Sequence, residues 1–243
     1  MTDSPTTGFQ RARSAEQREI RQQTILDAAA ELLHEMPVGE ISLRELSRRV
    51  GLSKTNVVRY FETREAVFFE LLNRSLAQWT ADLAGELSAL ETADAATTST
   101  AADTAVVTGT LARSLAARPL LCGLLSALGP ELERNISTET ALEFKLTHTR
   151  LLDDLADLLH RHLAAPTGTA TSTTAPTRAE ARELVSLTVV YTAGLWPFAQ
   201  PSDAVAEALR DSRLAPTKVD FAARLDRTLQ VAVAGLSTIG PTA

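Results

Sequence analysis

The 243-residue chain has one cysteine, Cys122, and its aromatic residues make up only 5% of the composition. A single cysteine excludes a disulfide within the chain and a zinc site built from several thiolates. It is typical of a protein from a reducing compartment. Because the surrounding segment "PLLCGLL" is apolar, we expect Cys122 to be a buried small side chain, with a redox sensor as the alternative.

Long hydrophobic runs are also missing. No apolar segment reaches the roughly 18 residues that a membrane-spanning helix needs, and the polar N-terminus does not look like a secretory leader. We therefore expect a cytoplasmic protein with no membrane partner. Apolar residues make up 44% of the chain, enough for a sizeable core and about two domains.

Signatures of common enzyme active sites are absent as well. The sequence has no nucleophile elbow, phosphate-binding loop, metal-binding helix pair or dinucleotide fingerprint. The nearest approach to a metal pair is His160 with His162, but residues two apart on a helix point to different sides. We therefore predict that the protein is not an enzyme and that it has no cofactor or metal site.

Charge is distributed unevenly along the chain. The net charge is −6, which argues against a general polyanion-binding protein. Between residues 41 and 61, however, five basic residues accompany a single acidic one, whereas after residue 80 there are 13 basic and 19 acidic residues. Contacts with an anion are therefore expected in the N-terminal part. The five basic residues are Arg44, Arg48, Arg49, Lys54 and Arg59.

The same N-terminal part contains a predicted helix-turn-helix. An apolar stripe predicts a first helix from about residue 15 to Met36. Ser42 is placed to cap a second helix, with Glu45 as its capping-box partner, and Gly51 to end it. Ser53 then caps a third helix. Two short helices joined by a tight glycine turn describe this motif.

The third helix has a polar face where such a motif reads DNA. Helical spacing places Val57 and Phe61 inward and Val58 at the border. Arginine can read guanine and asparagine can read adenine in the major groove. A solvated face on an ordinary helical bundle is the alternative. The predicted outward residues are Thr55, Asn56, Arg59 and Tyr60.

The segment "ILDAAAELLHEMPVGEISLRELSRRVGLSKTNVVRYFETREAVFFELL" resembles the DNA-binding domain of the TetR/AcrR family of transcriptional repressors. The resemblance covers about residues 18–72, because the apolar stripe, the Gly51 turn, the Tyr60-Phe61 pair and the Arg64-Glu65 start of a fourth helix match in register. It implies an all-α fold, with an N-terminal three-helix DNA-binding domain and a C-terminal helical bundle for ligand binding and dimerisation.

The resemblance also implies roles for single residues. Arg59 would be the main base reader, because Val58 stands where many members have a tyrosine that contacts DNA. Arg11 and Arg13 precede the first helix and are either a minor-groove arm or a solvated tail. The residues implied to contact phosphate or bases are Ser42, Arg44, Lys54, Thr55, Asn56, Arg59, Tyr60 and Arg64.

Beyond the motif we predict further helices and two mobile connectors. Residues 1–14 are expected to be a disordered arm, residues 15–62 the DNA-binding domain, and residues 63–243 the regulatory and dimerisation domain. The low-complexity segments 92–104 and 166–177 are the expected connectors. A fourth helix should be capped by Thr63 and run to about Leu90. The remaining expected helices lie near 104–117, 119–128, 130–164, 178–195, 203–211 and 217–237, with "WPFAQPS" as an interruption after residue 195.

The resemblance implies a homodimer that binds a palindromic operator in double-stranded DNA. The pairing helices would be about 178–196 and 217–237, both of which are apolar on more than one face. A core helix of a monomer would have the same pattern. A two-fold dimer presents two recognition helices to a symmetric operator.

The expected effector is an unknown small molecule that is hydrophobic or amphipathic. We expect the protein to be a repressor that leaves its operator when this molecule binds. A ligand-independent repressor and an activator are the alternatives. His148 shares a helix face with Phe144 and would contact either a ligand or a backbone group. The expected pocket residues, each of which also fits a plain core position, are Trp79, Leu83, Leu125, Phe144, His148, Tyr191, Trp196 and Phe198.

Overall fold

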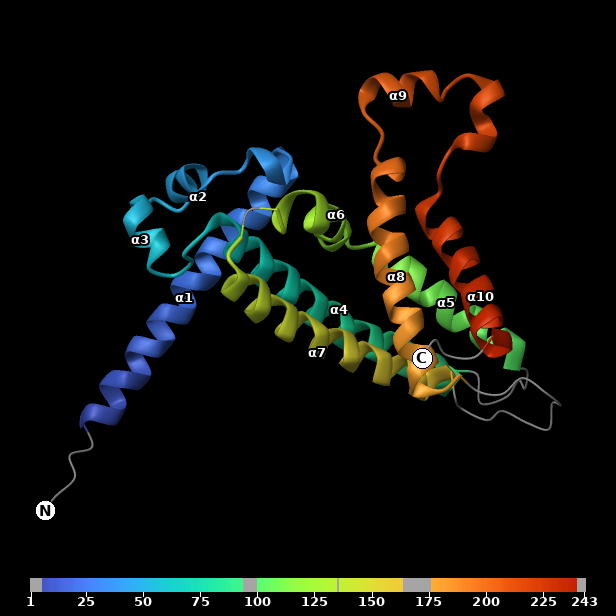
Figure 1. Ribbon diagram of the computed structural model, residues 1–243, viewed down its shortest axis with the longest axis horizontal. Helices are drawn as coiled ribbons and strands as arrows, with labels where there is room; N and C mark the ends of the chain where they lie inside the picture. The colour runs from blue at the N-terminus through green and yellow to red at the C-terminus, as the bar shows by residue number, and fades with distance from the viewer. Residues whose placement is uncertain (1–5, 94–99, 135, 164–175, 240–243) are drawn as a thin grey trace, which may run out of the picture.

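A computed structural model describes residues 6–93, 100–134, 136–163 and 176–239. Every regular element in these ranges is a helix, which confirms the predicted all-α class. The molecule is elongated: α1, α2 and α3 lie at one end, and α5, α8 and α10 lie at the other (Figure 1). We call the first part the head (residues 6–63) and the second the body (residues 64–239).

The head consists of α1 (Thr6–Glu35), the short turn η1 (Val38–Glu40), α2 (Leu43–Arg49) and α3 (Lys54–Val58). The Ser42 hydroxyl accepts a hydrogen bond from the Glu45 backbone N–H at 3.2 Å, and the Ser53 hydroxyl caps α3 in the same way. Gly51 has φ of 67°, the left-handed conformation that glycine adopts at low cost. The predicted helix-turn-helix is therefore confirmed. The capping box is only half formed, because the Glu45 carboxylate binds Arg48 instead.

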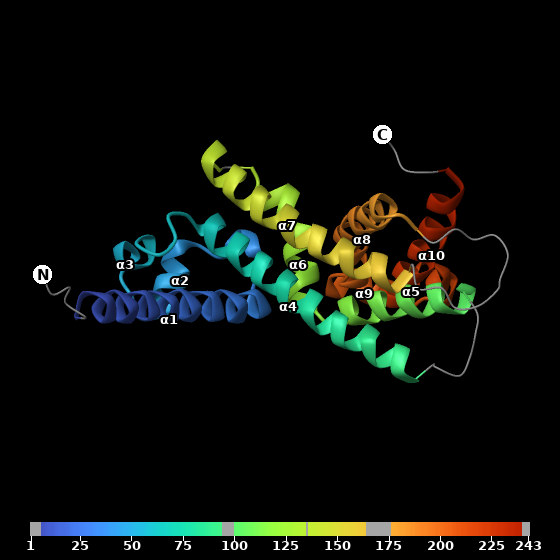
Figure 2. The ribbon, with the colours of Figure 1, turned by 90° about the horizontal axis from the view of Figure 1, so that it is seen from below.

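Helix α1 begins earlier than predicted. The expected disordered arm at residues 1–14 is wrong from Thr6 onward, where the chain is helical. No proline follows Pro5 until Pro37, so nothing removes a backbone N–H within the helix. The N-terminal turns project past α3 (Figure 2), and residues 15–21 are exposed. The side chains of Arg11 and Arg13 lie outside the described part.

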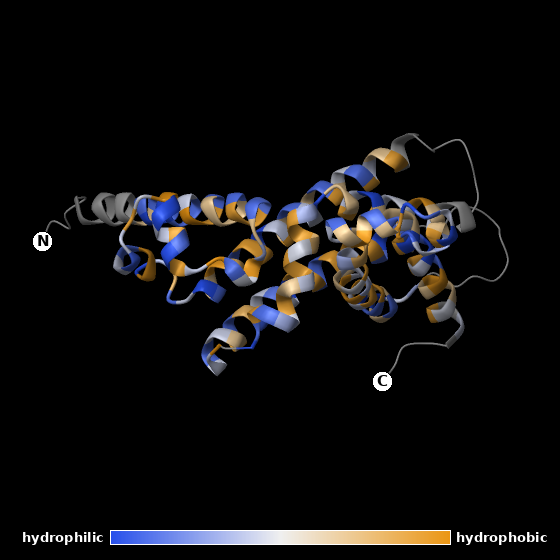
Figure 3. Cartoon of the chain, turned by 90° about the horizontal axis from the view of Figure 1, so that it is seen from above, coloured by the Kyte–Doolittle hydropathy of each residue, from blue (hydrophilic) through white to orange (hydrophobic). Residues whose placement is uncertain are grey.

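The body begins with α4 (Arg64–Ala93), whose first turn is capped by the Thr63 hydroxyl as predicted. Helix α4 runs from the head into the body and packs against α7, while α10 packs against α5 and α8 (Figure 1). The amphipathic character of the helices is visible as hydrophobic and hydrophilic residues alternating along each one (Figure 3). The other body elements are α5 (Thr100–Ala116), α6 (Pro119–Ala127), η2 (Leu128–Leu132), α7 (Thr138–Leu163), α8 (Arg178–Ala199), α9 (Asp203–Ala208), η3 (Ser212–Thr217) and α10 (Phe221–Ile239).

Several predicted boundaries are wrong. Helix α7 begins at Thr138 and not near residue 130, because Gly129 and Pro130 lie in a separate π-helical turn that ends at Leu132. Helix α8 continues through Pro197 to Ala199, since a proline in the last turn removes only one backbone bond.

The two predicted connectors are only partly described. Helix α5 begins at Thr100, inside the first predicted connector, because the Ala- and Thr-rich run contains no glycine or proline. Residues 94–99 and 164–175 lie outside the described ranges. Where the chain is described again, Thr177 caps α8 through a reciprocal capping box with Glu180.

Within the described residues, no single helix has the length and apolar character to cross a membrane. Two consecutive helical segments, Thr104–Ala116 and Pro119–Leu132, are together long and apolar enough, but they meet at an angle of 85°.

Candidate functional site

Helix α3 turns a polar face to solvent, as the sequence predicts. Val57 is fully buried, which anchors the helix to the head. Thr55, Asn56 and Arg59 are exposed, and Tyr60 is half-buried. Val58 is 38% exposed and adds an apolar position to the outer face. The face therefore offers an amide, a hydroxyl and a guanidinium, which can recognise base edges.

The arginines and the lysine of the head whose side chains are described fall into two groups. Arg48 pairs with Glu45, and Arg49 pairs with Glu31 and Glu35 at 3.2 and 2.6 Å. The hydrogen bond from Arg49 lowers the pKa of Glu35. The second group forms no ion pair within the described residues and consists of Arg18, Arg21, Arg44, Lys54 and Arg59.

The cations without an ion pair among the described residues lie on α1, on α2 and on or beside α3. Lys54 and Arg59 lie on or beside α3, and Arg44 is exposed in the first turn of α2, next to the exposed Ser42. Their charge is not offset by a protein carboxylate, so it remains available to an external anion such as phosphate. These residues are thus accessible to DNA, and their contacts with it stay a prediction.

Arg64 has an internal role that the sequence did not indicate. Its Nη1 donates to the carbonyl oxygens of Val38, Gly39 and Ile41 at 3.1, 3.2 and 3.3 Å. Its Nε donates to Glu65 at 3.0 Å. The guanidinium therefore ties the start of α4 to η1. The predicted phosphate contact of Arg64 has to compete with these bonds.

Residues 17–21 of α1 and the residues that end α3 border a cleft of about 740 Å³. The Arg18 guanidinium lies over the Tyr60 ring, 5.9 Å from its centroid. The cleft is lined by Gln17, Arg18, Ile20, Arg21, Arg59 and Tyr60, a set without a carboxylate. Sequence reasoning missed Arg18 and Arg21; their spacing of three residues on one helix is a signal that was available.

Part of the predicted ligand pocket is a packed aromatic cluster between α4 and α7. The Phe144 ring stacks on Phe69 and on His148, with centroids 4.2 and 5.0 Å apart. His148 Nδ1 lies 3.0 Å from the side-chain oxygen of Asn73, so it donates to that oxygen. Burial lowers the pKa of His148 to about 4, which keeps the ring neutral at pH 7. The partner of His148 is thus a side chain, neither of the two expected partners.

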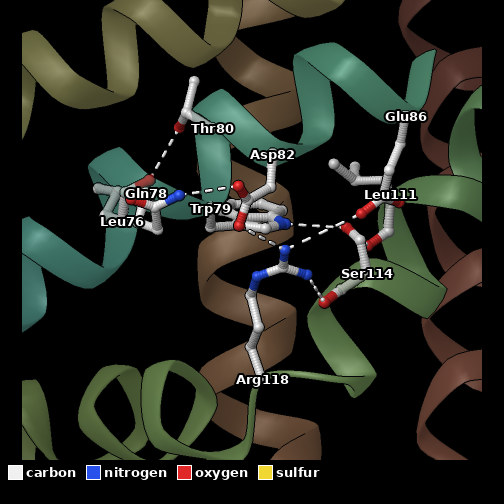
Figure 4. A network of polar contacts seen from close by, with 9 residues as sticks. All are labelled: Leu76, Gln78, Trp79, Thr80, Asp82, Glu86, Leu111, Ser114 and Arg118. Atoms are coloured by element: carbon white, nitrogen blue, oxygen red, sulfur yellow. Dashed lines mark hydrogen bonds and ion pairs between the residues drawn. The ribbon is translucent and has the colours of Figure 1, made fainter. Parts of the chain in front are cut away.

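A second polar group, buried at Trp79 and Ser114 and partly exposed at Asp82 and Arg118, joins α4 to the corner between α5 and α6 (Figure 4). The indole N–H of Trp79 donates to the Ser114 hydroxyl at 2.8 Å. Arg118 donates to the Ser114 carbonyl at 2.6 Å and pairs with Asp82 at 2.9 Å. The predicted pocket residues Leu83 and Leu125 are also buried in the core.

Two predicted pocket residues do not face the interior. Tyr191 is 40% exposed and Phe198 is 70% exposed on the outer face of α8. Their spacing of seven residues puts them on one side of the helix, next to the buried stripe that includes Thr188 and Thr192. The structure places these two side chains at the surface of the chain, and their role as ligand contacts stays a prediction. Trp196, partly buried, packs edge-on against Phe221 with centroids 5.1 Å apart.

Two grooves separate the head from the body. The larger has a volume of about 810 Å³ and lies between α1, α4 and the α5–α6 corner, with Leu26, Trp79 and Arg118 among its lining residues. The smaller, about 520 Å³, lies between α1, α6 and the end of α8 and includes Trp196. Of the predicted pocket residues, Trp79 and Trp196 are the ones that border these grooves.

The chain matches two family models. The model described as "Bacterial regulatory proteins, tetR family" matches residues 25–71, and the model described as "Tetracyclin repressor-like, C-terminal domain" matches residues 73–240. The first covers the C-terminal part of α1 together with α2 and α3, which carry Arg44, Lys54 and Arg59, and the second covers most of the body. None of the curated proteins matches the chain.

Solved structures of regulators have a similar fold. The fatty acid degradation regulator FadR from Bacillus halodurans is 15% identical, with a TM-score of 0.54 over 88% of this chain and 95% of that one. FadR from Bacillus subtilis in complex with stearoyl-CoA is 15% identical, with a TM-score of 0.51 over 88% and 98%. A TetR transcriptional regulator from Rhodococcus sp. RHA1 is 13% identical, with a TM-score of 0.55 over 94% and 100%. At these identities the likeness is one of fold.

Proposed function

The chain belongs to the TetR family and is a DNA-binding transcriptional regulator, and from this we propose that it is a homodimeric repressor released from a palindromic operator by a small hydrophobic or amphipathic molecule. Regulators of this family act by binding DNA and are generally not enzymes. The single observation that carries the proposal is the outer face of α3, where polar side chains lie beside Lys54 and Arg59, cations that form no ion pair among the described residues.

In this proposal α3 enters the major groove. Arg59 and Asn56 face the base edges, and Lys54 and Thr55 lie at the start of the helix, where a helix-turn-helix meets DNA. Phosphate contacts come from residues flanking α3. These are Ser42, Arg44 and Tyr60.

Exposed apolar residues on α8 and α10 support the dimer. Val190 is 65% exposed and Tyr191 40% exposed on α8, and Val231 is 57% exposed on α10. The two helices pack side by side (Figure 1), so these residues can form one apolar surface for a second copy. A two-fold pair would present two copies of α3 to a symmetric operator.

The larger groove supports a ligand-dependent release. It is bordered by α1 from the head and by α4 and α6 from the body, so a molecule inside it would contact both parts. A ligand that binds one arrangement of head and body more tightly shifts the population toward it. The lining is mostly apolar, with Arg74 and Arg118 as donors. That chemistry suits an amphipathic molecule, the class to which the stearoyl-CoA bound by the Bacillus subtilis FadR belongs.

Selection of bound sequences from a random duplex pool tests the DNA part. A homodimeric reader of an operator enriches a palindrome. Enrichment of an asymmetric site, or none with folded protein, would contradict it. The recovered operator then serves to screen amphipathic molecules for a loss of DNA affinity. If none changes the affinity, the ligand-independent repressor is the better description.

A charge placed on α8 tests the dimer surface. Val190→Glu should give a monomer in sedimentation and weaken operator binding, because a carboxylate cannot be buried there without a partner. Val205→Glu is the matched control, since Val205 is 50% exposed on α9, outside the proposed surface. A Val190→Glu protein that stays dimeric would reject this surface.

A further inference from the structure

Helix α1 carries two exposed arginines, Arg18 and Arg21, that are not part of the recognition helix α3. Arg18 and Arg21 line the cleft beside α3 together with Arg59, and no carboxylate is among the described side chains that line it. The nearby Glu19 is engaged by Arg74 at 2.8 Å, on another side of α1. Three guanidiniums around one cleft repel one another unless an anion lies between them.

The geometry of α1 holds these arginines in a fixed place. Arg18 and Arg21 are three residues apart on a continuous helix and therefore share a face. From residue 15 onward, where the side chains are described, the first fully buried residue of α1 is Ile25. From there to Thr6 a helix rises about 28 Å, and it projects past α3 in both ribbon views (Figures 1 and 2).

The Tyr60 ring restrains one of the two side chains. With its guanidinium 5.9 Å from the ring centroid, Arg18 forms a cation–π contact. A guanidinium held in this way loses less conformational freedom when it binds phosphate, and its fork of N–H groups fits phosphate oxygens. The cleft is therefore organised for an oxyanion before any ligand arrives.

The position beside α3 identifies the anion. Phosphates line both edges of the major groove, so an oxyanion site next to a helix in that groove faces the DNA backbone. We infer that Arg18 and Arg21 bind backbone phosphates of the operator just outside the stretch that α3 reads, so that α1 is a rigid second contact with the duplex. The inference rests on DNA binding by this family and not on the proposed dimer or ligand.

Salt dependence of binding tests this role. Affinity for the selected operator and for an unrelated duplex is measured by anisotropy between low and moderate salt, using full-length protein. Arg18→Ala and Arg21→Ala should each flatten the slope of log affinity against log salt by about 0.9 per bound subunit. The loss should be the same factor on both duplexes, because phosphates carry no sequence information. The double variant should show the sum.

Two matched variants separate a contact from a change in overall charge. Arg161→Ala removes the same charge from an exposed position at the end of α7, far along the body, and should leave the slope unchanged. Arg21→Lys keeps the charge and should keep most of the slope. Far-ultraviolet circular dichroism shows that each variant is folded.

Three outcomes would overturn the inference. The first is an unchanged slope in folded Arg18→Ala and Arg21→Ala. The second is an equal flattening in Arg161→Ala, which would make the effect one of net charge. The third is a loss confined to the operator, which would make these arginines readers of bases.

Discussion

Replacing Arg64 by alanine separates an internal role from a phosphate contact. The guanidinium occupies the gap between η1 and α4, where it donates to three backbone carbonyls and to Glu65. The side chains of Arg64 and Glu65 are only 20% and 17% exposed. Alanine would therefore leave acceptors and a carboxylate without their donor in a largely buried place.

The cost follows from these contacts. Nη1 has two hydrogens, so the three carbonyl contacts amount to about two bonds. A hydrogen bond to a charged group contributes about 1.5–3 kcal/mol, and such terms are not additive. We expect Arg64→Ala to lower the stability of the head by about 2–4 kcal/mol. Arg64→Lys should lose about half as much stability. The ammonium keeps the charge and some of the hydrogen bonds, but it cannot reproduce the planar arrangement of N–H groups in the guanidinium.

Hydrogen exchange of the η1 and α2 amides measures this loss locally, which matters because both tryptophans lie outside the head. Arg48→Ala is the control, since its side chain is 76% exposed and its pairing with Glu45 is worth little. The salt slope of DNA binding should not change in Arg64→Ala. Unchanged exchange together with a slope flattened by about one would refute the internal role and establish the phosphate contact.

Three further outcomes are expected. Arg59→Ala should weaken operator binding by about 1–3 kcal/mol and relax its sequence preference; an equal loss on random duplex would reject base reading. Burial lowers the pKa of His148 from 6.5 to about 4. As pH falls, the imidazole of His148 therefore gains its proton in the unfolded chain before it does so in the folded one. The free energy of unfolding, measured with urea, should drop by about 2 kcal/mol between pH 7 and pH 5. The His148→Asn variant should lack this part of the pH dependence. If the unfolding free energies of the variant and the original protein change identically with pH, the buried neutral His148 is contradicted. Burial raises the pKa of Cys122 to about 12, so an aromatic disulfide reagent at pH 8 should react only as the protein unfolds; immediate reaction would refute this.

Features stabilised by neighbouring residues were predictable from the sequence. The caps at Ser42, Ser53 and Thr63 each satisfy an N–H three residues ahead, and all three form. Gly51 adopts the positive φ that its place after α2 requires. The outward set on α3 follows from helical periodicity alone, because one buried position, Val57, fixes the phase of the helix.

Errors in the boundaries came from composition. The first residues of α1 and of α5 are rich in threonine and small residues, which suggested disorder, yet neither run contains a proline that would stop a helix. In the opposite sense, Pro197 suggested a break that α8 does not have. Local propensity is a weak guide where a neighbouring helix can extend into the segment.

The tertiary structure decided which of the predicted residues are available to a ligand. Arg64 meets carbonyls up to 26 residues away, and His148 meets Asn73 across 75 residues. The packing of the helices also places Arg18, Arg21 and Arg59 around one cleft and leaves Tyr191 exposed. A sequence specifies caps, turns and the phase of each helix, because those bonds span three or four residues. Whether a charge is neutralised or free depends on which helices pack together, and that is set only when the whole core forms.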